Sequence, residues 1–412
     1  MTFILCVIVM VIMSIARVTN AVQYCVATTG NNSNSCAAAS GADCSVVATP
    51  KLTISGATGG AQCASAGDTV EVANGTYAEG LYASTTPLRN GSSGSVITLK
   101  KRTGATVTMQ PPGGNIVIAF NNSIHYWTVD GINIDGRSLS GGTATTIGVS
   151  TDDLSSNITI KDLTIRNMSN NGGTGNSQGI GGSGTNITID NVEVDGTHDN
   201  FGDYEGGHCM YISQQNSTNY IVQNSHVHDC GGIGITANNG ATTLNQGLII
   251  RNNKVHNVGR SVSATKSGIA VSSRQQNGLI YNNLVYDNPG AGITVYGIST
   301  ENIGVYNNSV YNNGNPGIGI GTFNAGLNIK VKNNIVYNNN AGINIYQWAN
   351  GTILDDNLVY NHTTPVINNG VNSTLGTVIT SNPLFVNAAA GDFHLQTGSP
   401  AINVGTDLSA TF

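Results

Sequence analysis

The sequence predicts an all-β protein in which short strands stack as successive coils. Its 412 residues include 53 Gly and only 9 Pro, and 39% are apolar, a balance typical of β-rich chains with many turns. A unit of 23 to 33 residues recurs about nine times. Each unit contains three short apolar strands and no amphipathic helical segment, so equivalent strands can bury their faces only by stacking from coil to coil.

The amino terminus resembles a secretory signal. Residues 3–13 (FILCVIVMVIM) are an apolar run too short to span a bilayer, and Ala21 is a small residue suited to cleavage. Because no positive segment precedes the run, an uncleaved anchor is the alternative. We therefore predict a signal peptide at residues 1–21, a secreted, extracellular protein, and no membrane span once the signal is removed.

The cysteines favour a disulfide framework. Six of them follow the signal, an even number for an oxidising compartment, and none has the C-x-x-C spacing of a zinc site. These disulfide candidates are Cys25, Cys36, Cys44, Cys63, Cys209 and Cys230. The first four could staple an amino-terminal cap in a connectivity that the sequence leaves open, and the last two could join consecutive coils.

The repeat is clearest around Val-Tyr and Val-His dipeptides. Their valines recur every 23 to 30 residues, at Val227, Val255, Val285, Val310, Val336 and Val359. An Asn pair precedes most of them, and a strand of form Gly-Ile-x-Val follows after a loop of variable length. Stacked Asn amides can hydrogen-bond from coil to coil, and Asn tolerates the left-handed backbone of a sharp turn. Propeller blades and leucine-rich repeats fit this pattern less well.

The chain resembles a right-handed parallel β-helix protein of the pectate-lyase superfamily. The resemblance rests on the Asn column, on "CASAGDTVEVANGTYAEG" as the first coil and on "SNPLFVNAAAGDFHLQTGSPAINVG" as the closing segment. It implies about ten coils of three strands, in a single domain with a disulfide-bearing cap. The expected divisions are a cap at residues 22–66, the β-helix at residues 67–380 and a closing segment at residues 381–412.

The resemblance also implies that polysaccharide binds outside the Gly-Ile-x-Val sheet. If Ile and Val point inward, two columns of that sheet point outward. The first is Tyr211, Gly234, Ala270, Thr294, Gly319 and Asn344, and the second is Ser213, Thr236, Ser272, Tyr296, Gly321 and Tyr346. Small residues beside tyrosines suit a sugar chain. Tyr286, Tyr311, Tyr337 and Tyr360, with His228 and His256, lie on another wall and are interpreted as a structural stacking ladder.

Charged residues are scarce, so their clustering near the groove is informative. For β-elimination of a uronate polymer, Lys266 or Arg274 is predicted as the base, and His208 or Tyr211 as the proton donor. Asp199, Asp203 and Glu205 offer the oxygen ligands that Ca²⁺ prefers. The predicted substrate contacts are Tyr296, Gln214, Gln275, Arg260 and Tyr346. The Asp152-Asp153 pair is interpreted as a solvated turn.

These patterns lead to a function hypothesis with several alternatives. We expect a secreted, carbohydrate-active polysaccharide lyase that acts as a monomer on an acidic polymer of the pectate or alginate type. The calcium and polygalacturonase signatures of the superfamily are absent, which keeps a non-catalytic glycan-binding or adhesive protein, a uronate C5-epimerase and a glycoside hydrolase as alternatives. The net charge of −6 and the lack of a basic run argue against nucleic acid as a partner.

Overall fold

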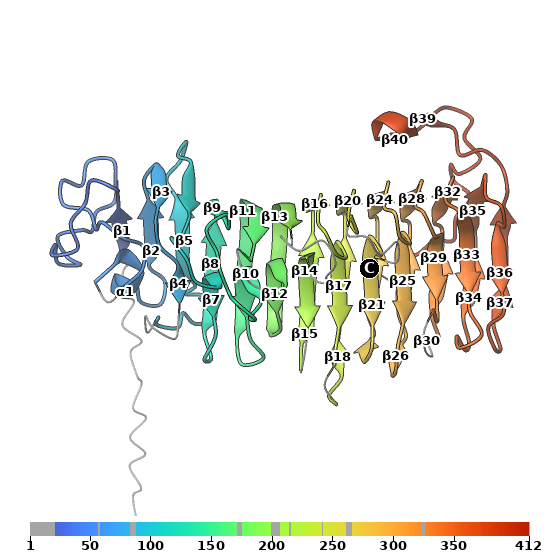
Figure 1. Cartoon of the computed structure of the whole chain (residues 1–412), viewed down its shortest axis with the longest axis horizontal. Coiled ribbons are helices and arrows are strands. Elements are labelled where there is room, and N and C mark those ends of the chain that lie inside the picture. The colour runs from blue at the N-terminus through green and yellow to red at the C-terminus, as the bar shows by residue number, and fades with distance from the viewer. Residues whose placement is uncertain are drawn as a thin grey trace, which may run out of the picture.

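The computed structural model describes residues 21–411, except residues 57, 83–87, 171–174, 199–206, 214–215, 241, 261–265 and 323–325. Over these residues the chain forms an elongated right-handed coil of parallel strands (Figure 1). This confirms the predicted all-β parallel β-helix. The predicted signal peptide lies outside the described residues, apart from Ala21. None of the described helices has the length and apolar character needed to cross a bilayer.

The Gly-Ile-x-Val strands form one wall, called here the first sheet. Among the described residues it has 11 parallel strands. They are β4 (Leu81–Tyr82), β7 (Ile116–Phe120), β10 (Thr146–Thr151), β12 (Ser177–Gly182), β14 (His208–Ser213), β17 (Ile235–Asn238), β21 (Ile269–Ser272), β25 (Ile293–Tyr296), β29 (Pro316–Ile320), β33 (Ala341–Ile345) and β36 (Val366–Asn368).

The strands before the Asn turn form the second wall, and those after it form the third. Strands β11 (Ser156–Ser169) and β13 (Thr185–His198) run through both walls and join them into one sheet. The second wall also contains β1 (Gln23–Val26), β2 (Thr69–Val72), β5 (Ile97–Lys101), β8 (His125–Asp130), β15 (Thr218–Gln223), β19 (Ile249–Arg251), β23 (Leu279–Tyr281), β27 (Gly304–Tyr306), β31 (Lys330–Lys332), β34 (Ile353–Asp355) and β37 (Thr374–Leu375).

The third wall carries the x-V-Y-N strands. Besides β11 and β13 it contains β3 (Gly75–Tyr77), β6 (Val107–Met109), β9 (Ile132–Asp135), β16 (His226–His228), β20 (Lys254–His256), β24 (Leu284–Tyr286), β28 (Ser309–Tyr311), β32 (Ile335–Tyr337), β35 (Asn357–Tyr360) and β38 (Val378–Ile379). Two-residue strands β18 (Asn245–Gln246), β22 (Gln275–Gln276), β26 (Thr300–Glu301) and β30 (Gly326–Leu327) line the turn between the first sheet and the second wall. The repeat valines of the third wall point into the core and are at most 1% exposed.

The Asn pairs form the sharp turn between the second and third walls. The first residue of each pair is left-handed, as at Asn282 with φ 54° and Asn307 with φ 53°. The second residue is buried, and its amide joins a ladder along the axis: Asn283 Nδ2 donates to Asn308 Oδ1 over 3.0 Å, and Asn308 Nδ2 to Asn334 Oδ1 over 2.9 Å. Each amide thereby satisfies polar groups that burial would otherwise leave unpaired.

Three disulfides join the six predicted cysteines. Cys25 pairs with Cys44 and Cys36 with Cys63, around strand β1 and the short helix α1 (Gly60–Cys63). Cys209 in β14 pairs with Cys230 after β16, with 5.7 Å between their Cα atoms. The last bond joins strand β14 to the segment that follows β16.

The closing segment folds back along the third wall. A hairpin of β39 (Phe385–Asn387) and β40 (Asp392–Leu395), linked by the turn η1 (Ala388–Ala390), lies over strands near the carboxyl end of the solenoid (Figure 1). The Phe393 ring centroid is 5.2 Å from that of Tyr286 and 5.6 Å from that of Tyr311. The hairpin therefore covers part of the aromatic column, whose upstream members His228 and His256 stack on each other at 5.3 Å.

Candidate functional site

A groove of about 690 Å³ lies on the outer face of the first sheet. Strands β10, β12, β14, β17, β21 and β25 form its floor, and the segments that precede or follow them form its rims. The lining residues with ionisable or amide side chains are Asp152, Asp153, Asn176, Gln178, His208, Tyr211, Asn238, Lys266 and Tyr296. Four predicted site residues, His208, Tyr211, Lys266 and Tyr296, thus share one groove.

His208 begins strand β14 and is almost completely buried. Burial, and then the nearby positive charge of Lys266, lower its pKa to about 4. The Ile233 backbone N–H donates to His208 Nδ1 over 2.9 Å. At neutral pH the imidazole is therefore uncharged, with its proton on Nε2. In this state His208 can donate a hydrogen bond from Nε2, and neither ring nitrogen is available as a base.

Tyr211 and Tyr296 place two phenol rings in the same groove. The Tyr211 ring stacks on His208 with 5.2 Å between centroids, and the Asn238 amide donates to the Tyr211 hydroxyl over 3.3 Å. Burial raises the pKa of Tyr296, and the neighbouring Tyr211 adds to the rise. The two rings therefore line the same groove from strands three coils apart.

The outward columns need one correction in register. Tyr211 pairs with Thr236, and Thr236 pairs with Ala270, so the first column passes through Thr236. The predictions of Gly234 in the first column and of Thr236 in the second column were therefore wrong, and Asn238 takes the place in the second column. The Ile233 N–H bonds to the His208 ring, and the strand begins at Ile235, two residues later than the first Gly-Ile repeat suggests.

Lys266 precedes strand β21 and is only 8% exposed. It lines the groove together with His208, and its positive charge helps to lower the pKa of that imidazole. The aspartates at the other rim were missed as groove residues. Asp152 accepts from the Asn122 backbone N–H over 2.7 Å and from the Ser155 hydroxyl over 2.6 Å, while Asp153 is exposed. Their strand β10 lies upstream, where the repeat is weak and its register is hard to read.

The other predicted site residues that the structure describes lie away from the groove lining. Arg274 follows β21 in a left-handed turn, with φ 59°, and donates to the Asn239 carbonyl over 3.3 Å. Gln275 is buried, at 1% exposed, so its amide cannot meet an external polymer. Arg260 binds Asp229, with 2.6 Å between Nη1 and Oδ1, at the third wall. Tyr346 follows β33, three coils beyond β21.

The predicted calcium ligands Asp199, Asp203 and Glu205, and the predicted substrate contact Gln214, lie outside the described residues. In the sequence they stand between β13 and β14 and directly after β14. Their roles therefore stay predictions.

A family model described as "Right handed beta helix region" matches residues 212–385. No curated protein sequence matches the chain. Among solved structures, XylC in complex with xylose is 15% identical with a TM-score of 0.51, and the match covers 88% of this chain and 70% of that one. The A-module of the mannuronan C-5 epimerase AlgE4 of Azotobacter vinelandii is 16% identical with a TM-score of 0.51, and the match covers 77% of this chain and 91% of that one.

At such identities the likeness to solved structures concerns the fold, and function has to be argued from the groove. The family match and the strand register agree with the resemblance seen in the sequence. Together they identify the chain as a right-handed parallel β-helix protein.

Proposed function

We propose that the protein is a secreted, carbohydrate-active polysaccharide lyase that cleaves a uronate-containing polymer by β-elimination. The observation that carries the proposal is the convergence of Lys266, His208 and Tyr211 in the groove on the first sheet. An open trough suits a polymer that enters and leaves along its length, and Tyr296 offers an aromatic face for a sugar ring. XylC with bound xylose and the mannuronan epimerase, both of this fold, support a sugar polymer as ligand.

The reaction needs a base for the C5 proton and an acid for the leaving oxygen. We assign the base to Lys266, which in its neutral form takes the proton next to the uronate carboxylate. The electron pair of the C5–H bond then forms the C4–C5 double bond as the C4–O bond breaks. Tyr211 gives its phenolic proton to the leaving oxygen. His208, neutral and protonated at Nε2, hydrogen-bonds the carboxylate as negative charge develops on it.

No role is assigned to Ca²⁺ in the mechanism, and its effect on activity is left to the assay described below. Ca²⁺ prefers six to eight oxygen ligands. In the described part of the groove, both oxygens of Asp152 already accept hydrogen bonds, which leaves Asp153 as the aspartate with an exposed carboxylate. Because the predicted ligands Asp199, Asp203 and Glu205 lie outside the described residues, no step of the mechanism is assigned to the ion.

The test is an assay on defined polymers. Purified protein is incubated with pectate, alginate and glycosaminoglycans, with and without Ca²⁺, and the ultraviolet absorbance of the unsaturated uronate is followed. We expect absorbance with at least one acidic polymer. A flat trace on all of them would exclude a lyase. Reducing ends without absorbance would indicate a hydrolase, and inverted C5 centres seen by NMR without cleavage would indicate an epimerase.

Two variants then test the assigned base. Lys266→Ala is expected to lower kcat by about 10²-fold or more, the usual contribution of general base catalysis. Lys330→Ala removes the same charge from an exposed site on the second wall and is the matched control. Arg274→Ala tests the other predicted base. If Lys266→Ala keeps the full rate, or if Arg274→Ala causes the loss instead, the assignment fails while the lyase activity stands.

A further inference from the structure

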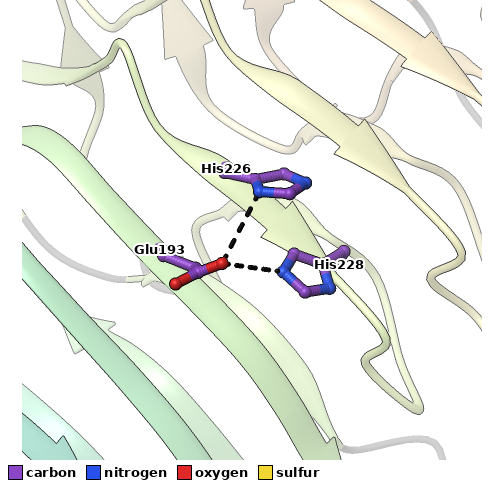
Figure 2. A group of neighbouring side chains, drawn as sticks. All are labelled: Glu193, His226 and His228. Carbon is purple, nitrogen blue, oxygen red and sulfur yellow. Dashed lines mark hydrogen bonds and ion pairs between the residues drawn. The ribbon is translucent and has the colours of Figure 1, made fainter. Parts of the chain in front are cut away.

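A cluster of histidine and acidic side chains lies on the outer face of the third wall, away from the groove. Strand pairing aligns Glu193 of β13 with His226 of β16, and Asp195 of β13 with His228 of β16. Figure 2 shows the Glu193 carboxylate pointing at both imidazole rings. The cluster is thus built from two successive coils, and every member belongs to a regular strand with a fixed register.

The distances within the cluster match those between ligands of one metal ion. Glu193 Oε1 is 3.7 Å from His226 Nδ1 and 3.4 Å from His228 Nε2. All three atoms lie within 4.8 Å of one another. Ligand atoms 2.0–2.2 Å from a tetrahedral Zn²⁺ lie roughly 3.3–3.6 Å apart. Small side-chain rotations would therefore bring all three atoms onto one ion.

Supporting hydrogen bonds orient these three atoms. His228 Nδ1 is 2.8 Å from Asp229 Oδ2, and the other Asp229 oxygen is held by Arg260. Glu193 Oε2 accepts a hydrogen bond from the Thr164 hydroxyl over 3.1 Å, and the other carboxylate oxygen, Oε1, faces the two rings. A histidine ligand that donates its second N–H to a carboxylate is the usual arrangement at metal sites.

His226 has an equivalent support from the next coil. Its Nε2 is 2.8 Å from His256 Nε2, so an N–H of His226 there leaves Nδ1 with a lone pair. In the tautomers with the His228 proton on Nδ1 and the His226 proton on Nε2, a lone pair on each ring faces the Glu193 carboxylate, so a cation between the three atoms would be bound by all of them.

The surrounding charges favour a cation. Three carboxylates, Glu193, Asp195 and Asp229, face two basic side chains, Lys254 and Arg260. The acidic side chains outnumber the basic ones by one, and a bound cation would balance the remaining negative charge.

We propose that Glu193 Oε1, His226 Nδ1 and His228 Nε2 bind a divalent transition-metal ion, for which Zn²⁺ is the probe. Two imidazoles and one carboxylate suit Zn²⁺, whereas Ca²⁺ and Mg²⁺ prefer oxygen ligands alone. Water occupies the fourth position. The ion joins β13 to β16 and so ties two coils together beside the Cys209–Cys230 disulfide.

The test is metal binding by the full protein, purified without a polyhistidine tag and stripped with EDTA. Isothermal titration with Zn²⁺ should show a single saturable site per chain, which Ca²⁺ and Mg²⁺ do not fill. Co²⁺ should give the visible absorption of a four-coordinate ion, and Zn²⁺ should raise the thermal midpoint. If Zn²⁺ neither binds saturably nor shifts the midpoint, a proton bridges the cluster and the proposal fails.

Variants locate the site. Glu193→Gln keeps the shape of the side chain and should weaken Zn²⁺ binding at least about tenfold, and the double variant His226→Asn, His228→Asn should abolish it. His394→Asn is the control, because His394 forms a histidine–aspartate pair with Asp392 on an exposed hairpin. Circular dichroism checks the fold of each variant. Unchanged affinity in Glu193→Gln, or equal loss in His394→Asn, would overturn the assignment.

Discussion

The two asparagines of each pair have different roles at the turn between the second and third walls. Asn307 supplies the left-handed backbone, while Asn308 is buried and bonded on both sides. Asn308 Oδ1 accepts from the backbone N–H and the amide of Asn283, and its Nδ2 donates to Asn334 and to the Ile280 carbonyl. The Asn-Asn pair recurs in successive coils of the sequence. This recurrence was enough to predict both roles, because each role requires asparagine at the same place in every coil.

We predict that Asn308→Ala lowers the free energy of unfolding by about 2–5 kcal/mol, since it leaves two buried donors of Asn283 without an acceptor. Asn312→Ala is the matched control. Asn312 is left-handed and bonded to its neighbours but exposed, so its replacement should cost only about 1–2 kcal/mol, mainly for the left-handed backbone. Urea unfolding followed by circular dichroism measures both variants. Equal effects would show that burial of the ladder contributes little.

The groove residues were only partly predictable, for reasons that are also local. His208, Tyr211 and Tyr296 lie on first-sheet strands, where alternation fixes their direction. Arg274 and Gln275 follow strand β21, but consecutive left-handed residues, Ser273 and Arg274, turn the chain away from the groove. Sequence spacing does not reveal such a turn.

The histidines of the third wall were interpreted as architectural because they share a column with tyrosines. The acids Glu193 and Asp195 lie one coil earlier, 33 residues before His226 and His228 in each case. Pairing the coils by register would have brought the acids and the histidines together. Residue spacing within one coil does not reveal this cluster, because ligands from different coils are far apart in the sequence.

At the scale of elements, the hairpin of β39 and β40 acts as a lid on the stacking column. Phe393 contacts Tyr286, Tyr311 and Phe385, whose ring centroids lie 5.2 to 5.6 Å away. Two hydrogen bonds hold the closing segment further along the chain. Asn333 Nδ2 donates to the Thr406 carbonyl over 2.8 Å, and the Thr406 N–H donates to Asn333 Oδ1 over 3.0 Å. A two-stranded hairpin is marginal by itself, so its stability comes from the wall beneath it.

We therefore predict that Phe393→Ala releases the closing segment while the solenoid stays folded. Limited proteolysis should cut within residues 381–411 at least about tenfold faster, which corresponds to the loss of about 1.4 kcal/mol of docking energy. His394→Ala changes the adjacent, exposed residue and should be cut at the rate of the unchanged protein. Equal protection in Phe393→Ala would mean that the contacts of Asn333 and Thr406 alone hold the segment.

At the scale of the whole molecule, the two ends are stabilised by different means. The three disulfides among the described residues all lie before residue 231, whereas the buried ladder runs from Asn253 to Asn357. In a solenoid each coil contacts only its neighbours, so one end can open while the other persists. Disulfides are also typical of an oxidising compartment, which supports the proposed secretion.

Reduction should therefore loosen the protein from its amino-terminal end. With a reducing agent present, we expect amide hydrogen exchange to increase first in β1, β2 and the cap around them, while β23, β27 and β31 keep their protection. Exchange measured by mass spectrometry, with and without the reducing agent, gives the comparison. A uniform increase along the chain would show a single cooperative unit instead.

The buried asparagine ladder also has a consequence for the length of the molecule. Every amide donates in the same direction along the axis, from Asn253 toward Asn357, and each link has the same donor and acceptor. A complete coil carrying its own asparagine could therefore be inserted or removed between two others without changing the chemistry of either junction. Because the asparagine turn is the same in every coil, the loops beside the groove can differ from one coil to the next without changing how the coils stack.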